Sequence, residues 1–235
     1  MKTRPAMITV LKDLFVIQVK PQIFFLTVAY VLFLVCWVIG IVSTWLLLVL
    51  PPPYLLSPTQ FALSYLAPMI GDFVGEVWGH YFNDFVANWY IRTHNGFWVS
   101  EVRLWGTYMP TLVGFAGLVL IGQTLQQGLH WISLCVGWGF LVFAMVSATT
   151  AVSAYCLDSF PNHAALVAAI INMWRTTAGF CVVFFQLKWI AADGPATSFG
   201  IQALLLALAF LAGPVLTQIM GKKWRHKYAP PKAEN

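Results

Sequence analysis

Charged residues are scarce in this sequence. Asp, Glu, Lys and Arg together make up 9% of its 235 residues, against about 25% in an ordinary soluble domain. Hydrophobic residues make up 60%, and the mean hydropathy is +0.76. A water-soluble fold has no way to bury so much apolar surface beneath so little charge. The sequence therefore predicts an integral membrane protein.

The apolar runs also lack the alternation of apolar and polar residues that a membrane-spanning β-strand needs. Since lipid cannot satisfy backbone polar groups, a bundle of helices remains. A bilayer core about 30 Å thick takes about 20 apolar residues per helix, so the chain has room for roughly six spans. We predict an all-α integral membrane protein, a six-transmembrane-helix bundle. The expected spans are residues 22–50, 59–87, 105–123, 130–156, 164–187 and 197–219.

Signatures of soluble enzymes and of cofactor sites are missing as well. The sequence has no GxGxxG after a strand, no P-loop, no HExxH and no GxSxG. Its histidines do not cluster, and its cysteines lack CxxC spacing. We expect no enzyme activity, no cofactor and no metal, and the net charge of +5 carries no nucleic-acid implication. A membrane enzyme stays a minor alternative, without a nucleophile and base to support it.

The few cations are sorted by side of the expected membrane. Of the 13 Lys and Arg residues, eleven fall on the side that holds both termini and the expected loops 88–104 and 157–163. They are Lys2, Arg4, Lys12, Lys20, Arg92, Arg103, Lys222, Lys223, Arg225, Lys227 and Lys232. Lys188 falls on the other side and Arg175 inside a span. The positive-inside rule then predicts that both termini are cytoplasmic.

This sorting also gives the expected organisation of the chain. We predict a cytoplasmic lead-in over residues 1–21, a transmembrane domain over 22–219 and a basic cytoplasmic tail over 220–235. An odd number of spans would destroy the sorting, so the charges support an even number independently of hydropathy. The expected location is a cellular membrane crossed several times, and we expect it to be the plasma membrane.

The second span carries an unusual series of ionisable residues. Asp72, Glu76, His80 and Asp84 recur every four residues, which places them on one slowly rotating helix face. Asp72 lies about 20 Å and Glu76 about 25 Å from the outer end of the span. An acid at such depth costs about 2.5–3.5 kcal/mol, so it faces a cavity or a partner. We expect both to handle substrate or protons, the alternative being buried acids that only pack the bundle; Asp84 is expected to organise a loop.

The fifth span carries Arg175, with Asn172 one turn before it. Arg175 lies roughly 18 Å from the cytoplasmic end of the span, which is too deep for its side chain to reach water easily. It needs an acidic partner or a wet cavity. Asp72 lies at a similar depth, so an Asp72–Arg175 pair is one hypothesis. A structural ion pair and a role in anion binding or gating both stay open.

Small residues accompany the acids of the second span. Gly71, Gly75 and Gly79 follow one another at four-residue spacing. Such a series forms a smooth stripe on a helix and lets a second helix approach closely. We predict that the stripe is a helix-packing face.

Several short motifs occur in order along the chain. Residues 51–57 (PPPYLLS) are followed by 65–71 (YLAPMIG), and residues 100–104 (SEVRL) come later. Residues 154–161 (AYCLDSFP) lead to 172–180 (NMWRTTAGF). In this combination the sequence resembles the C-terminal six-helix half of fungal major facilitator superfamily transporters of the drug/proton-antiporter type.

The resemblance implies one half of the major facilitator fold, in which two six-helix halves hold substrate at their interface. It implies proton-coupled secondary transport of a small solute, by a half or fragment of a transporter. The implied substrate and proton-coupling candidates are Glu76, Asp72, Arg175 and Asn172, and the implied cytoplasmic-loop motif is Asp84, Glu101, Arg103 and Asp158. Expected partners are the lipid bilayer, a small solute, protons and a second six-helix half or a second copy. The alternative is a non-transporting truncated or degenerate six-helix membrane protein.

Overall fold

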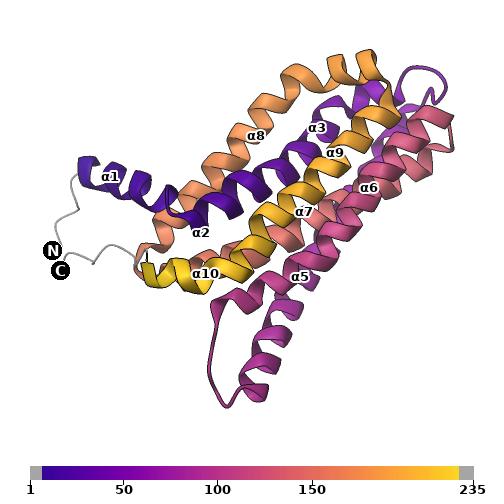
Figure 1. Ribbon diagram of the computed structural model, residues 1–235. Helices are drawn as coiled ribbons and strands as arrows, with labels where there is room; N and C mark the ends of the chain where they lie inside the picture. Colours follow the sequence, from indigo (N-terminus) through magenta and orange to yellow (C-terminus); the bar gives the residue numbers. More distant parts are fainter. Residues whose placement is uncertain (1–6, 228–235) are drawn as a thin grey trace.

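The computed structural model describes residues 7–227, and this part of the chain is helical without any strand. Its elements run as one bundle of long helices (Figure 1). They are α1 (Met7–Gln18), α2 (Pro21–Phe24), η1 (Phe25–Val31), α3 (Leu32–Val49), α4 (Pro58–Ser64), α5 (Leu66–Thr93), η2 (Ser100–Thr107), α6 (Tyr108–Gln127), α7 (Trp131–Ser159), η3 (Pro161–His163), α8 (Ala164–Asp193), α9 (Pro195–Phe210), η4 (Leu211–Val215) and α10 (Leu216–Lys227). The segments η1 and η4 are π-helical, and η2 and η3 are 3₁₀-helical.

The predicted all-α membrane bundle is confirmed. Among the described residues, 5 helices are long and apolar enough to cross a membrane. They are Pro21–Val49, Ser100–Gln127, Trp131–Ser159, Pro161–Asp193 and Pro195–Trp224. The helix α5 does not reach that degree of apolarity, because it carries the acids of the second expected span. It is 28 residues long and packs along α7, so it has the length and the place of a further span.

Two of the predicted loop regions are wrong in extent. The helix α5 continues to Thr93 and η2 begins at Ser100, so most of the expected loop 88–104 is helical. Similarly, α8 runs to Asp193 and includes Lys188, which was expected in a loop. Polar residues do not end a helix that is leaving the membrane, since water satisfies their side chains. These two helices end where the next residues need a positive φ, at Asn95 with Gly96 and at Gly194.

The predicted glycine packing face is confirmed, and it fixes α5 against α7. Gly71, Gly75 and Gly79 are all buried. A Cβ on Gly71 would lie 2.3 Å from the backbone oxygen of Gly139, so a larger residue would force the two backbones apart. A Cβ on Gly75 would lie 3.1 Å from the backbone oxygen of Phe143. The backbones of α5 and α7 are therefore in close contact over two turns.

The remaining helices are arranged around α7. Both α5 and α6 pack on α7, α9 packs on α6, and α3 packs mainly on α8. The largest fully buried side chains include Trp45, Trp138, Tyr30 and Tyr155. Trp45 donates a hydrogen bond from Nε1 to Ser64 Oγ at 2.8 Å, which satisfies its polar edge inside the bundle.

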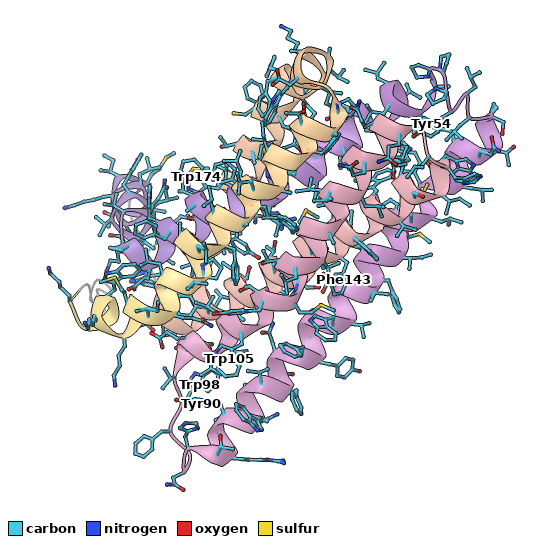
Figure 2. All side chains as sticks on the ribbon, turned by 45° about the vertical axis from the view of Figure 1, so that its right-hand side comes forward. Tyr54, Tyr90, Trp98, Trp105, Phe143 and Trp174 are labelled. Atoms are coloured by element: carbon cyan, nitrogen blue, oxygen red, sulfur yellow. The ribbon has the colours of Figure 1, made fainter. Side chains whose placement is uncertain are left out.

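Aromatic side chains with a polar edge gather at both ends of the bundle (Figure 2). Tyr90, Trp98 and Trp105 lie at the end where α5 meets η2, and Tyr54 lies at the opposite end. The hydroxyl of Tyr54 donates to the backbone oxygen of Thr124 at 2.9 Å. Tyr and Trp near the ends of a helical bundle are typical of a protein whose ends lie at the two surfaces of a bilayer.

Candidate functional site

A groove of about 590 Å³ opens between α3, α5, α7 and α8. Its lining is mostly aliphatic, but it includes one acid and one base. The lining residues are Val35, Val38, Ile39, Val42, Pro68, Asp72, Val142, Met145, Asn172, Arg175 and Thr176. We call it the Asp72–Arg175 groove. A concave, mainly apolar pocket with a few convergent polar groups is the usual form of a small-molecule site.

One face of α8 supplies the polar wall of the groove. Asn172, Arg175 and Thr176 are spaced by three and four residues from Asn172, so they project from the same side of the helix. The hydroxyl of Thr176 donates to the backbone oxygen of Asn172 at 2.9 Å. That bond occupies the Thr176 hydroxyl as a donor and leaves the Arg175 guanidinium as the strongest donor in the groove.

The hypothesis of a direct Asp72–Arg175 ion pair is wrong. Within residues 7–227, no salt bridge and no hydrogen bond joins Asp72 or Arg175 to another side chain. The two residues instead line the same groove from α5 and α8. Of the two environments expected for Arg175, the structure therefore provides a cavity rather than a contacting acid.

Asp72 and Glu76 differ in their relation to the groove. Each directly follows a glycine that packs against α7, Gly71 and Gly75 respectively, and each is exposed. Asp72 lines the groove, whereas Glu76, one turn further along α5, is not part of its lining. The groove thus brings together Asp72, Asn172 and Arg175 but leaves Glu76 outside.

Residues of the expected cytoplasmic-loop motif join η2 to the end of α7. Arg103 Nε donates to Asp158 Oδ2 at 2.5 Å, and its guanidinium lies 5.3 Å from the ring centre of Trp98. Asp158 lies in the last turn of α7, where a negative charge opposes the helix dipole, so the Arg103 cation offsets an unfavourable placement. The motif was expected in loops, whereas Glu101 and Arg103 lie in η2 and Asp158 lies in α7.

Glu101 and Asp84 have different surroundings. Glu101 is buried, and its Oε1 lies 2.9 Å from where a Cβ would stand on Gly221 of α10. It therefore belongs to the contact between η2 and α10. Asp84 is exposed on α5, and its neighbour Asn83 is the residue that is buried against Gly106. The structure does not bring Asp84 together with the other three motif residues.

Several polar residues that lie in the groove or in the interior were not among the predicted site residues. Thr176 follows Asn172 by four residues, a spacing that was enough to predict it on the groove face. Gln186 and Gln202 form a fully buried pair between α8 and α9, with Gln202 Nε2 donating to Gln186 Oε1 at 3.1 Å. Each is an amide side chain inside an otherwise apolar span, and this feature of the sequence could have identified them. The groove residues of α3 are plain aliphatics, and no sequence signal distinguishes them from lipid-facing ones.

The chain is similar in sequence to several fungal membrane transporters. The chain is 27% identical to an uncharacterised MFS-type transporter of Schizosaccharomyces pombe, over 74% of this chain and 30% of that protein. It is 26% identical to Protein HOL1 of Saccharomyces cerevisiae over 74% of the chain, and 28% identical to MFS-type transporter penM of Penicillium rubens over 91%. The chain is similar to fungal transporters of the major facilitator type. Other similar proteins of this superfamily include the MFS antiporter QDR3 of Candida albicans, at 26% identity over 68% of the chain.

The major facilitator likeness covers only a part of each relative. The chain spans 30% of the length of the first two proteins and 43% of MFS-type transporter penM. No family model matches the chain, and no solved structure gives a significant match. The likeness to major facilitator transporters therefore rests on the curated relatives, and the all-helical membrane bundle is consistent with it.

Proposed function

We propose that the chain forms one six-helix half of a major facilitator secondary transporter, and that the Asp72–Arg175 groove is its part of the solute site. The observation that carries this proposal is the pair of opposite charges facing one largely aliphatic groove between four long helices. Charges inside a membrane bundle are costly and mark the paths of substrates and ions. In transporters built from repeats, such sites lie where the repeats meet.

The groove residues have complementary roles in this proposal. Arg175 and Asn172 bind the polar or anionic part of a small organic solute, and the aliphatic walls of α3 and α7 bind its apolar part. The Asp72 carboxylate binds either a cationic group of the solute or a proton. A solute and a proton that compete for one carboxylate are coupled, because each lowers the affinity for the other by the same factor.

A second unit completes the groove and covers Glu76. The exposed faces of α5 and α8 carry large apolar side chains, among them Phe73 and Phe180, beside the exposed carboxylate of Glu76. Lipid is a poor partner for that carboxylate. We place a second six-helix half, or a second copy of this chain, against this face, and we assign Glu76 to proton exchange at the resulting interface.

The same proposal includes an orientation. The helices α1 and α10, which carry Lys12 and Lys222, lie at the same end of the bundle (Figure 1). Lys20 directly precedes α2, Arg103 lies in η2, which packs on α10, and Lys188 lies in the last two turns of α8. The positive-inside rule supports cytoplasmic termini. Lys2, Arg4 and Lys232, and the side chain of Arg225, lie outside the described residues. We propose the plasma membrane as the location, since one relative is named Quinidine resistance protein 3 and export across the cell boundary is one route to resistance.

A flux assay tests the proposed function. The full chain is reconstituted into proteoliposomes with an imposed pH gradient, and proton movement is recorded with a trapped pH dye while small organic cations and anions are added in turn. A solute that elicits proton flux through the wild-type chain should elicit none through Asp72→Asn or Arg175→Gln.

The matched control is Asp84→Asn, which removes the same charge from the same helix outside the groove. It should retain the flux. If no solute moves protons through the wild-type chain, in any oligomeric state that the preparation contains, the alternative of a non-transporting truncated or degenerate membrane protein is preferred.

A further inference from the structure

The helix α1 has two apolar sides, of which only one is covered. Its inner side packs against α8 and α2, with Ile17 fully buried and Leu14 against the core. On its outer side, Ile8 is 80% exposed, Phe15 is 66% exposed and Val19, just beyond the helix, is 74% exposed. The protein thus holds α1 in place by one side and leaves large hydrophobic side chains uncovered on the other.

These outer residues form a continuous stripe. Ile8, Leu11, Phe15 and Val19 follow one another at spacings of three and four residues, which keeps them on one side of a helix. We call them the α1 stripe. Thr9 lies on the same helix about 100° round from Ile8 and is also exposed; its side of the helix carries Asp13 as well as the exposed Val16, and it is less apolar than the α1 stripe.

The place of α1 in the chain brings this stripe to the membrane surface. Only Val19 and Lys20 separate it from the start of α2 at Pro21, which is also where the first membrane-spanning segment begins. The exposed apolar surface continues into that segment through Phe24. In Figure 1, α1 projects sideways from the end of the bundle at which α10 also lies. The stripe is therefore continuous with the surface that faces lipid.

The charges around the stripe match a lipid surface. Lys12 is exposed beside it, and Lys222 and Lys223 are exposed on α10 at the same end of the molecule. Anionic headgroups attract such cations when they lie within a few ångströms of the surface. A helix with an apolar stripe and neighbouring lysines is the usual form of a segment that lies in the plane of the bilayer interface.

We propose that α1 is an in-plane membrane anchor, with the α1 stripe embedded at the boundary between the headgroups and the acyl chains of the cytoplasmic leaflet. The proposal concerns a surface away from the Asp72–Arg175 groove and does not depend on transport. Its consequence is that the start of the first span is held at a fixed depth in the bilayer, because α1 and α2 are joined by two residues.

Nitroxide scanning tests the position of the stripe. Cys181 is exposed and the other cysteines are buried, so the full chain carrying Cys181→Ser is the background. Single cysteines at Ile8, Phe15 and Thr9 are spin-labelled in nanodiscs of phosphatidylcholine and phosphatidylserine. Collision with oxygen, which concentrates in the bilayer, is compared with collision with a water-soluble nickel chelate. Labels at Ile8 and Phe15 should favour oxygen, and the label at Thr9 should favour nickel.

Two other outcomes overturn the proposal. If all three labels favour nickel, α1 lies in water; if the stripe labels are reached by neither reagent, another protein surface covers them. A second variant sharpens the result: Phe15→Glu should shift the Ile8 label towards nickel, whereas Thr9→Glu should leave it unchanged. Because both side chains are exposed, neither substitution should alter elution in detergent, and the same elution shows that the fold is kept.

Discussion

Asp72 and Arg175 line the same groove without contacting each other. This separation leads to a prediction about stability. If they formed a buried pair, removing one partner would cost about 3–5 kcal/mol. As the structure has no such pair, we expect Asp72→Asn to change the free energy of unfolding by less than about 1 kcal/mol while it abolishes solute-dependent proton flux. Unfolding in mixed micelles measures the first effect. A loss of several kcal/mol would show that the two side chains pair in the membrane.

Glu76 makes a different prediction, because it lies outside the groove. A neutral glutamine at this position can neither bind nor release a proton. In an assembly that transports, Glu76→Gln should remove the dependence of transport on pH while expression and membrane insertion stay near wild type. Transport rates measured across a series of pH values decide the matter, and an unchanged pH profile would leave Glu76 with a packing role only.

The buried pair of Gln186 and Gln202 is expected to contribute to stability rather than to transport. Gln186 Nε2 and Gln202 Oε1 have no other partner among the described residues, so losing one amide leaves the other unsatisfied. Gln202→Leu should cost about 1–3 kcal/mol. The double variant with Gln186→Leu should cost less than the two single changes together. Gln127→Leu, at an exposed helix end, is the control, and strict additivity would mean that the two amides do not interact.

At the scale of elements, the contact between α5 and α7 is expected to be the least tolerant in the molecule. A methyl group on Gly71 meets the fixed backbone of Gly139, so Gly71→Ala should lower the free energy of unfolding by about 1–3 kcal/mol. Gly200 in α9 has open space around its Cβ position, and Gly200→Ala should be neutral or stabilise by up to about 1 kcal/mol. Thermal unfolding of the two variants checks this, and equal effects would contradict it.

The helices and the packing face of α5 were the most predictable part of the molecule. Long apolar runs predict helices because lipid offers the backbone no other partner. The glycine stripe predicted a packing face because residues four apart in sequence lie on the same side of a helix. The ends were less predictable: polar residues such as Asn88 and Lys188 looked like loops, yet the helices run through them until a positive φ is required.

The groove was predictable only in part, for a physical reason. Ionisable residues inside a span are conspicuous, so Asp72 and Arg175 could be found from sequence. Whether two helices turn these residues towards each other depends on how the helices pack, and one sequence does not contain that information directly. Glu76 lies one turn from Asp72 on the same side of α5, and the sequence spacing alone does not show that only Asp72 lines the groove.

For the whole molecule, the orientation is open to a direct measurement. Thr59 and Lys227 are exposed at opposite ends of the bundle, and in a Cys181→Ser background each is replaced in turn by cysteine. Thr59 is preferred to Ser57, because Ser57 caps α4 through Gln60 and its loss would loosen that helix. A membrane-impermeant thiol reagent should label only Thr59→Cys in intact cells and only Lys227→Cys in inverted vesicles. Labelling of both from one side would refute the predicted topology.

The close contact between α5 and α7 also sets which parts of the molecule move together. Because their backbones are in direct contact, we expect α5 and α7 to move as one unit, and α3 with α8 to move as another. Asp72 belongs to the first unit and Arg175 to the second. Under the proposed function, attraction between the opposite charges favours a narrow groove, and protonation of Asp72 removes that attraction. The proposal therefore ties the width of the groove to the charge on one carboxylate, so that a proton gradient would drive a mechanical opening.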